Sequence, residues 1–181
     1  MTLRRLRAAR VGSMALVWML LAACATRPVA DSQMPWTSGK LSLKVDASAG
    51  RPAQAVTAGF DLRGTDLRGE LRLISPVGTA IATARWSADR AVLQTSDGER
   101  EFGDLDALSR EALGEPLPLR ALPDWLAGRP WAGADVARRD AAGFEQLGWK
   151  IDLLRFGDGA LTASRSEAPT VVLRVRLERP D

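Results

Sequence analysis

Alternation of apolar and polar residues with period two runs through most of this chain and constrains its fold more than any other feature. The pattern is clear in Lys40–Val45 and Val56–Arg63, and it is typical of strands that bury one face. Segments of this kind span residues 40–45, 56–63, 67–73, 80–86, 91–95, 149–153, 160–165 and 171–177. Short turns separate many of them, which favours antiparallel neighbours. We therefore expect one long antiparallel sheet.

Helical spacing is confined to the middle of the chain. Asp104 can cap a helix that ends at Gly114. A second helical pattern runs over residues 119–128, where Pro123 predicts a kink or two short pieces. A long sheet must curl, and one thin helical layer fills the curl incompletely. The expected fold is therefore mainly β, with a short helical insert that lines or covers an apolar cavity.

The first 24 residues have the pattern of an export signal followed by a lipid attachment site. Four arginines precede an apolar run from Val11 to Ala23, which is shorter than the ~20 residues of a membrane-spanning helix. The run ends in Leu21-Ala22-Ala23-Cys24, which resembles the cleavage box of bacterial lipoproteins. In this interpretation residues 1–23 are a signal peptide, and Cys24 carries a diacylglycerol on sulfur and an acyl group on its amine. The alternative is an ordinary cleavage site followed by chance by the only cysteine of the chain.

Removal of residues 1–23 changes the charge of the protein. The whole chain has 25 Lys and Arg against 22 Asp and Glu, but residues 1–23 hold four arginines and no acid, which leaves 21 against 22. The mature chain is close to neutral and has no basic cluster, so we expect no nucleic acid partner. Residues 24–35 contain two prolines and no periodicity, which predicts a flexible tether. Residues 36–181 have the length of one domain.

The residues offer little catalytic chemistry. The chain has no histidine, which removes the commonest general base and metal ligand. Closely spaced acids occur at Asp104/Asp106 and Glu99/Glu101, and they are expected at turns or helix starts. We therefore expect neither an enzyme nor a bound cofactor or metal ion.

Three segments, Gly69–Thr79, Pro116–Pro130 and Phe144–Ile151, follow one another in this order behind the lipoprotein signal. Together they resemble outer-membrane lipoprotein receptors of the LolB family, and the resemblance begins near Trp36. It implies a half-open antiparallel β-barrel of about eleven strands with an internal helical lid. It also implies a receptor that accepts lipoproteins from the periplasmic carrier LolA, shields their acyl chains and inserts them into the outer membrane.

The resemblance also assigns a membrane-insertion loop. In the family, a protruding Asn-Pro-Leu-Gly-like turn carries an exposed leucine that insertion requires. The matching residues here are Ser75, Pro76, Val77 and Gly78, so the smaller Val77 is expected at the tip. On sequence grounds alone, a valine in such a Pro-x-Gly turn is more often tucked against the protein, and the resemblance shifts the expectation toward an exposed tip.

Leucines and tryptophans of the strands and the insert are candidates for the wall of the acyl cavity. They are Leu71, Leu73, Trp86, Leu119, Leu122, Trp125 and Trp149. Each tryptophan also fits an ordinary packed core.

The expected location is the periplasmic face of the outer membrane, with the protein lipid-anchored and monomeric. Ala25, in place of an aspartate, is by resemblance compatible with export to that membrane. The expected partners are LolA, cargo lipoproteins and the membrane itself. Two alternatives remain open: a soluble carrier-like protein, which Cys24 disfavours, and a structural or assembly lipoprotein, which needs no cavity.

Overall fold

The computed structural model describes residues 34–48, 50–113 and 115–178, which belong to one compact unit. Cys24 and the predicted signal peptide lie outside these residues. In chain order the strands are β1 (Thr37–Val45), β2 (Gln54–Gly64), β3 (Gly69–Ile74), β4 (Ala80–Trp86), β5 (Ala91–Thr95), β6 (Gly98–Phe102), β7 (Val136–Asp140), β8 (Gly143–Gln146), β9 (Trp149–Asp152), β10 (Ala160–Arg165) and β11 (Val171–Leu177). The helices are α1 (Leu105–Leu113), α2 (Leu122–Leu126) and the short 3-10 helix η2 (Phe156–Asp158).

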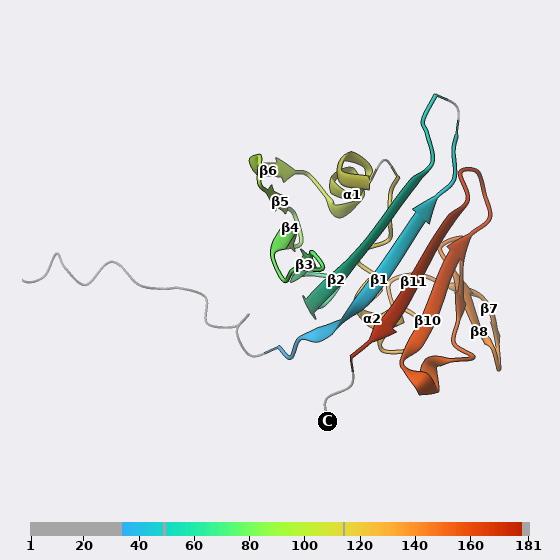
Figure 1. Cartoon of the computed structure of the whole chain (residues 1–181). Coiled ribbons are helices and arrows are strands. Elements are labelled where there is room, and N and C mark those ends of the chain that lie inside the picture. The colour runs from blue at the N-terminus through green and yellow to red at the C-terminus, as the bar shows by residue number, and fades with distance from the viewer. Residues whose placement is uncertain (1–33, 49, 114, 179–181) are drawn as a thin grey trace, which may run out of the picture. The chain divides into compact units, whose positions relative to one another are not determined.

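All eleven strands form a single antiparallel sheet in the order β6-β5-β4-β3-β2-β1-β11-β10-β9-β8-β7 (Figure 1). The two end strands, β6 and β7, do not pair with each other, so the sheet is not closed. The predicted fold, a half-open antiparallel barrel with short helices, is confirmed. Antiparallel pairing places the β1–β2, β3–β4, β8–β9 and β10–β11 turns at the same rim of the sheet.

The central strands bury one face, as their alternation predicts. In β11, Val171, Leu173 and Val175 are buried, whereas Arg174 and Arg176 are exposed. Pairing with β1 brings further apolar residues onto the same inner face, because Leu43 lies opposite Leu173 and Leu41 opposite Val175. This inner face is the core of the protein.

Three strands, β6, β7 and β8, carry no predicted alternation, and the first and second of these share one reason. Every residue of β7 is exposed, as are four of the five in β6, because these are the edge strands. A strand exposed on both faces needs no apolar residue at every second position, and charges there discourage edge pairing with other chains. Glu99 and Glu101, expected at a turn or helix start, lie in β6.

The helices agree with the sequence in position but differ from it in one detail. The Asp104 carboxylate accepts a hydrogen bond from the Ala107 N–H at 2.7 Å, which caps α1 as predicted. Its predicted end, Gly114, lies outside the described residues. Pro123 was expected to interrupt a helix, but it is the second residue of α2, where a missing N–H costs nothing.

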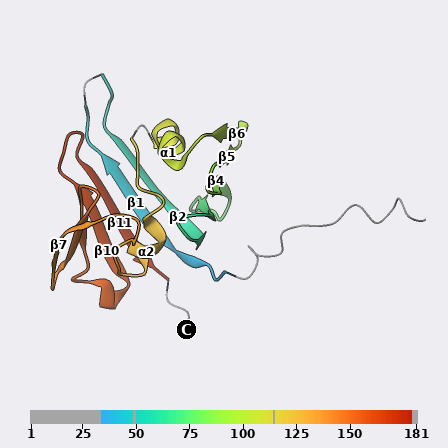
Figure 2. The ribbon, with the colours of Figure 1, turned by 180° about the vertical axis from the view of Figure 1, so that it is seen from behind.

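The two helices lie on the inner side of the sheet. In Figure 2, seen from behind, α2 lies in front of the central strands, and it packs against β2, while α1 packs against β5 and β6. Among the described residues no helix is long and apolar enough to cross a membrane.

Candidate functional site

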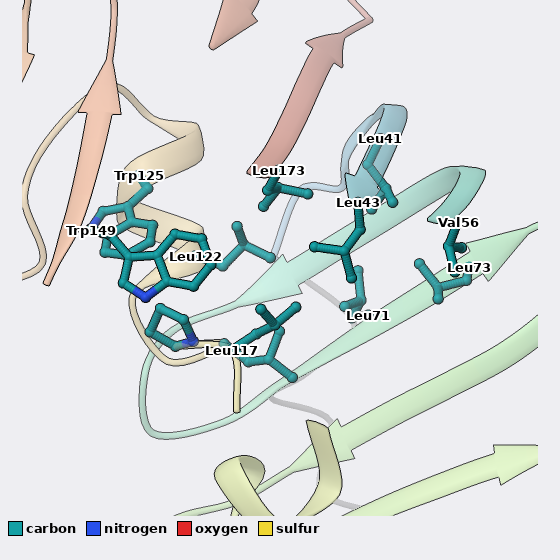
Figure 3. Close-up of a pocket in the computed structure, with 12 residues that line it drawn as sticks. Leu41, Leu43, Val56, Leu71, Leu73, Leu117, Leu122, Trp125, Trp149 and Leu173 are labelled. Carbon is teal, nitrogen blue, oxygen red and sulfur yellow. The ribbon is translucent and has the colours of Figure 1, made fainter. Parts of the chain in front are cut away.

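An apolar pocket lies between the inner face of the sheet and residues 115–126, which we call the lid segment. The sheet side comes from β1, β2, β3, β9 and β11, and the lid side comes from the connector before α2 and from α2 itself. No polar atom contributes to the lining surface. The lining residues are Leu41, Leu43, Val56, Leu71, Leu73, Leu117, Pro118, Leu119, Leu122, Trp125, Trp149 and Leu173 (Figure 3).

Two tryptophans form one end of this pocket, opposite Leu41 and Leu73 (Figure 3). The rings of Trp125 and Trp149 are tilted by 51°, with centroids 6.2 Å apart. The Trp125 indole N–H donates to the Gln146 side-chain oxygen at 2.9 Å. Because this N–H is bonded to Gln146, Trp125 adds only apolar surface to the pocket.

The fully buried Gln146 fastens the C-terminal end of the lid segment to β8. Its side-chain oxygen also accepts the Trp131 backbone N–H at 3.0 Å. Its side-chain NH₂ donates to the Trp131 and Ala134 carbonyls, both at 2.7 Å. All the polar atoms of this side chain are therefore used, and each of its partners lies on α2 or on the chain that follows it.

The N-terminal half of the lid segment has separate attachments. The Leu117 N–H donates to the Ser109 hydroxyl at 2.9 Å in a buried contact. The Arg120 guanidinium donates to the Asp66 carbonyl, in the β2–β3 turn, at 3.0 Å. These bonds hold the lid segment over the pocket.

The apolar pocket is small in this conformation, with a volume of about 60 Å³. An engineered apolar cavity of roughly 150 Å³ holds only a benzene molecule. A long acyl chain is far larger, so the lid segment or the strands must move before such a ligand can enter.

Six of the seven residues predicted for the acyl cavity line this pocket, and Trp86 does not. Trp86 is buried at the end of β4, where it pairs with Gly69 and its indole N–H donates to the Thr65 carbonyl at 3.0 Å. It faces inward but packs beside the β2–β3 turn, away from the pocket. Alternation along a strand predicts which face of the sheet a residue lies on, but it does not predict whether that residue lies near the pocket or near a turn.

Six lining residues were not among the predicted candidates: Leu41, Leu43, Val56, Leu117, Pro118 and Leu173. A signal for four of them was present, since alternation marks Leu41, Leu43, Val56 and Leu173 as inward residues of long strands. Which strands adjoin β3 across the sheet depends on pairing, and the local pattern does not show that pairing.

The β3–β4 turn projects Val77 from the rim. The Gly78 N–H donates to the Ser75 carbonyl at 2.9 Å, and the Ser75 N–H donates to the Thr79 carbonyl at 2.8 Å. Gly78 has φ +85°, so the glycine takes the left-handed position that closes the turn. Val77 follows Pro76 and is 86% exposed, which excludes the tucked-in alternative.

A buried carboxylate lies at the other end of the β3–β4 hairpin, near the start of β3. Glu70 of β3 lies 2.8 Å from both the Arg63 and Arg72 guanidinium groups. Burial raises the pKa of Glu70, but hydrogen bonds and charge from Arg63 and Arg72 outweigh burial and lower this pKa below its ordinary value. Glu70 is therefore ionised at neutral pH.

No group of three or more side chains suited to metal binding occurs among the described residues.

Comparison with known proteins identifies the family of this chain. The protein-family model described as "Outer membrane lipoprotein LolB" matches residues 36–180. The "Outer-membrane lipoprotein LolB" of Bordetella petrii is 36% identical over 89% of this chain and 88% of that protein. The proteins of the same name from Chromobacterium violaceum (34% identical; 77% of this chain, 79% of that protein) and Azoarcus sp. (31%; 90% and 84%) are also similar. The chain therefore belongs to the LolB family of outer membrane lipoproteins.

Proposed function

We propose that this protein is a non-enzymatic receptor that accepts acylated lipoproteins from the periplasmic carrier LolA and inserts them into the outer membrane. The observation that carries the proposal is a pocket with a wholly apolar lining, closed by a lid segment on an open sheet. Such a pocket suits acyl chains, which offer no polar group to bind. Family membership supports the location at the outer membrane.

The energetics of acyl burial allow this transfer without an external energy source. Burial contributes ~0.8 kcal/mol per CH₂, so a 16-carbon chain carries ~12 kcal/mol and three chains ~36 kcal/mol. Non-covalent protein sites reach only about −18 to −21 kcal/mol. A bilayer therefore holds the chains more strongly than any protein pocket, so overall transfer from carrier to membrane runs downhill. The first step requires that the receptor bind the chains more tightly than the carrier does.

The same proposal assigns roles to parts of the chain outside the pocket. Residues 1–23 act as the signal peptide, and Cys24 carries the lipid that keeps the receptor at the membrane. Residues 24–35 act as the tether, and residues 36–181 form the receptor domain. Pro76, Val77 and Gly78 form the loop that enters the bilayer during release.

The decisive experiment uses a lipid-free chain, residues 25–181, exported behind an ordinary signal peptide. This form keeps every residue that the structure describes. Mixed with LolA loaded with a lipoprotein, it should remove the cargo into a receptor–cargo complex, which size-exclusion chromatography separates. Failure to take cargo would favour the alternative, a structural or assembly lipoprotein of the outer membrane.

A matched pair of variants tests whether the pocket is responsible. Leu73→Gln places a polar group in the pocket wall and should reduce cargo uptake. Leu67→Gln makes the same change at a turn residue that is 60% exposed and does not line the pocket, so uptake should be unchanged. Equal uptake by both variants would contradict the assignment of the pocket. Mass spectrometry of the mature N-terminus separates this proposal from a soluble carrier, which would lack lipid on Cys24.

A further inference from the structure

A second pocket lies on the other side of the lid segment. Its volume is about 480 Å³, much larger than that of the apolar pocket. The two pockets share Leu117, Pro118 and Trp149 in their walls. The two pockets are therefore adjacent, with these side chains between them.

The second pocket differs from the first in its chemistry. Its lining residues include two acids, Asp104 and Asp106, and two arginines, Arg120 and Arg165. Hydrogen-bond acceptors and donors are thus present together. Such a mixture suits peptide and ester groups, which bring carbonyl acceptors and, in the peptide, N–H donors.

Arg165 is incompletely bonded within the protein. Its terminal nitrogen pairs with Glu115 at 3.1 Å and donates to the Pro169 carbonyl at 3.4 Å. Its Nε is buried and has no partner, the one such side-chain atom among the described residues. Glu115 belongs to the lid segment, so the lid segment holds this guanidinium in place.

Leu147, at the edge of the second pocket, is held in a costly backbone conformation. Its φ is +56°, and among the residues described it is the only non-glycine residue with a positive φ. It is 45% exposed. With Gly148 at φ +75°, it forms the two-residue turn between β8 and β9, where asparagine or glycine is the usual residue. A leucine that keeps 45% of its surface exposed in this conformation is a candidate for contact with a ligand.

We propose that the second pocket, which we call the junction pocket, binds the polar junction of the cargo. This junction comprises the ester and amide carbonyls at the acylated cysteine and the first residues of the peptide. The acyl chains enter the apolar pocket, the carbonyls meet the guanidinium groups, and Leu147 covers the junction from the edge. Opening of the lid segment draws Glu115 away from Arg165 and frees this donor for a cargo carbonyl. This inference rests on the receptor function proposed above.

The physical reason for a junction pocket is the abrupt change of polarity in the cargo. Carbonyl groups drawn against an apolar wall without hydrogen-bond partners lose free energy. A neighbouring pocket with donors removes this loss, and it also distinguishes an acylated peptide from a free fatty acid or a membrane lipid tail.

Two fluorescent probes separate this inference from the receptor function. One is a 16-carbon fatty acid, and the other is a synthetic six-residue peptide whose N-terminal cysteine carries three palmitoyl chains. Both are titrated into the lipid-free chain and into its Leu147→Asn variant. Because asparagine tolerates positive φ, the variant should melt at a temperature no lower than the parent. Its affinity for the acylated peptide should fall roughly fivefold, from loss of about half a leucine side chain of contact, and its fatty acid affinity should stay unchanged.

Leu67→Asn is the matched control, because Leu67 is an exposed turn leucine outside both pockets, and both its affinities should equal those of the parent. The inference is overturned if Leu147→Asn weakens both probes equally or neither. A parent chain that binds neither probe would instead overturn the receptor function.

A photoreactive residue directly after the probe's cysteine supplies a second readout. Mass spectrometry should find its crosslinks on the β8–β9 turn or on the start of α1. Crosslinks confined to the outer face of β2–β4 would exclude the junction pocket.

Discussion

Two hairpins at the same rim of the sheet carry exposed apolar tips, and they differ in which residue takes the left-handed backbone position. In the β3–β4 turn this position belongs to Gly78, so Val77 is exposed at no backbone cost. In the β8–β9 turn both residues, Leu147 and Gly148, take it. The comparison indicates that the first turn is built to project a side chain freely, while the second keeps a leucine against a backbone preference. We assign the first tip to the membrane and the second to the cargo.

The two hairpins also differ in what holds their strands. In the β3–β4 hairpin, at the end of the strands away from Val77, the carboxylate of Glu70 pairs with Arg63 and Arg72 on the outer face of the sheet. Behind Leu147, the uncharged amide of Gln146 bonds to Trp125 and to the chain after α2. The β8–β9 hairpin is therefore connected to the lid segment, and the β3–β4 hairpin is connected only to neighbouring strands through this cluster.

The largest expected effect is that of Gln146→Leu. Leucine removes four hydrogen bonds and leaves the Trp125 N–H and backbone groups of the following loop buried without partners. Unfolding free energy should fall by about 4 kcal/mol, measured by urea denaturation. The control is Gln94→Leu, at an exposed glutamine of β5 whose side chain bonds only Arg85. This change should alter the free energy of unfolding by less than about 0.5 kcal/mol. A loss below about 1 kcal/mol for Gln146→Leu would show that the lid segment is held elsewhere.

The second effect concerns the tips. Val77→Glu places a charge where the proposed loop enters hydrocarbon, at a cost of ~3 kcal/mol, so incorporation of cargo into liposomes should fall roughly a hundredfold. Uptake of cargo from LolA should be unchanged, because Val77 lines neither pocket. Val77→Leu adds one methylene and should raise incorporation about fourfold.

Leu147→Glu tests whether the Val77 tip and the Leu147 tip have different roles, one in membrane insertion and the other in cargo binding. If the comparison is correct, it weakens binding of the acylated peptide and leaves the membrane step intact. Equal loss of incorporation in Val77→Glu and Leu147→Glu would mean that both tips enter the membrane.

Most of the fold could be predicted from the sequence because most strands bury one face. The alternation in Lys40–Val45 and Val171–Leu177 reflects the inner wall of the sheet directly. The edge strands β6 and β7 could not be found in this way, because neither of their faces is buried. β8 is also missed. It is only four residues long and buries three of them, so it shows no alternation.

The pocket could be predicted in part. Leu71, Leu73 and the lid residues Leu119 and Leu122 are found by their types and spacing. Trp86 shows the limit, because its strand position faces inward but lies beside the β2–β3 turn. The strain at Leu147 was not visible either, since Leu-Gly at a turn gives no sign of which residue takes positive φ. Both depend on three-dimensional pairing rather than on local pattern.

The smallest expected effect distinguishes the two hairpins by pH. Glu70 has a lowered pKa in the folded protein, so its ion pairs contribute stability above the ordinary glutamate value of about 4.5, and this contribution is lost as the pH falls through the lowered value. Gln146 has no charge to lose. Amide hydrogen exchange, corrected for its intrinsic pH dependence, should therefore show protection falling in β3 and β4 on acidification before it falls in β8 and β9. Glu70→Gln should remove this difference and lower protection of β3 and β4 at neutral pH. If both hairpins lose protection together in the parent chain, the charged cluster does not stabilise the β3–β4 hairpin separately from the rest of the sheet.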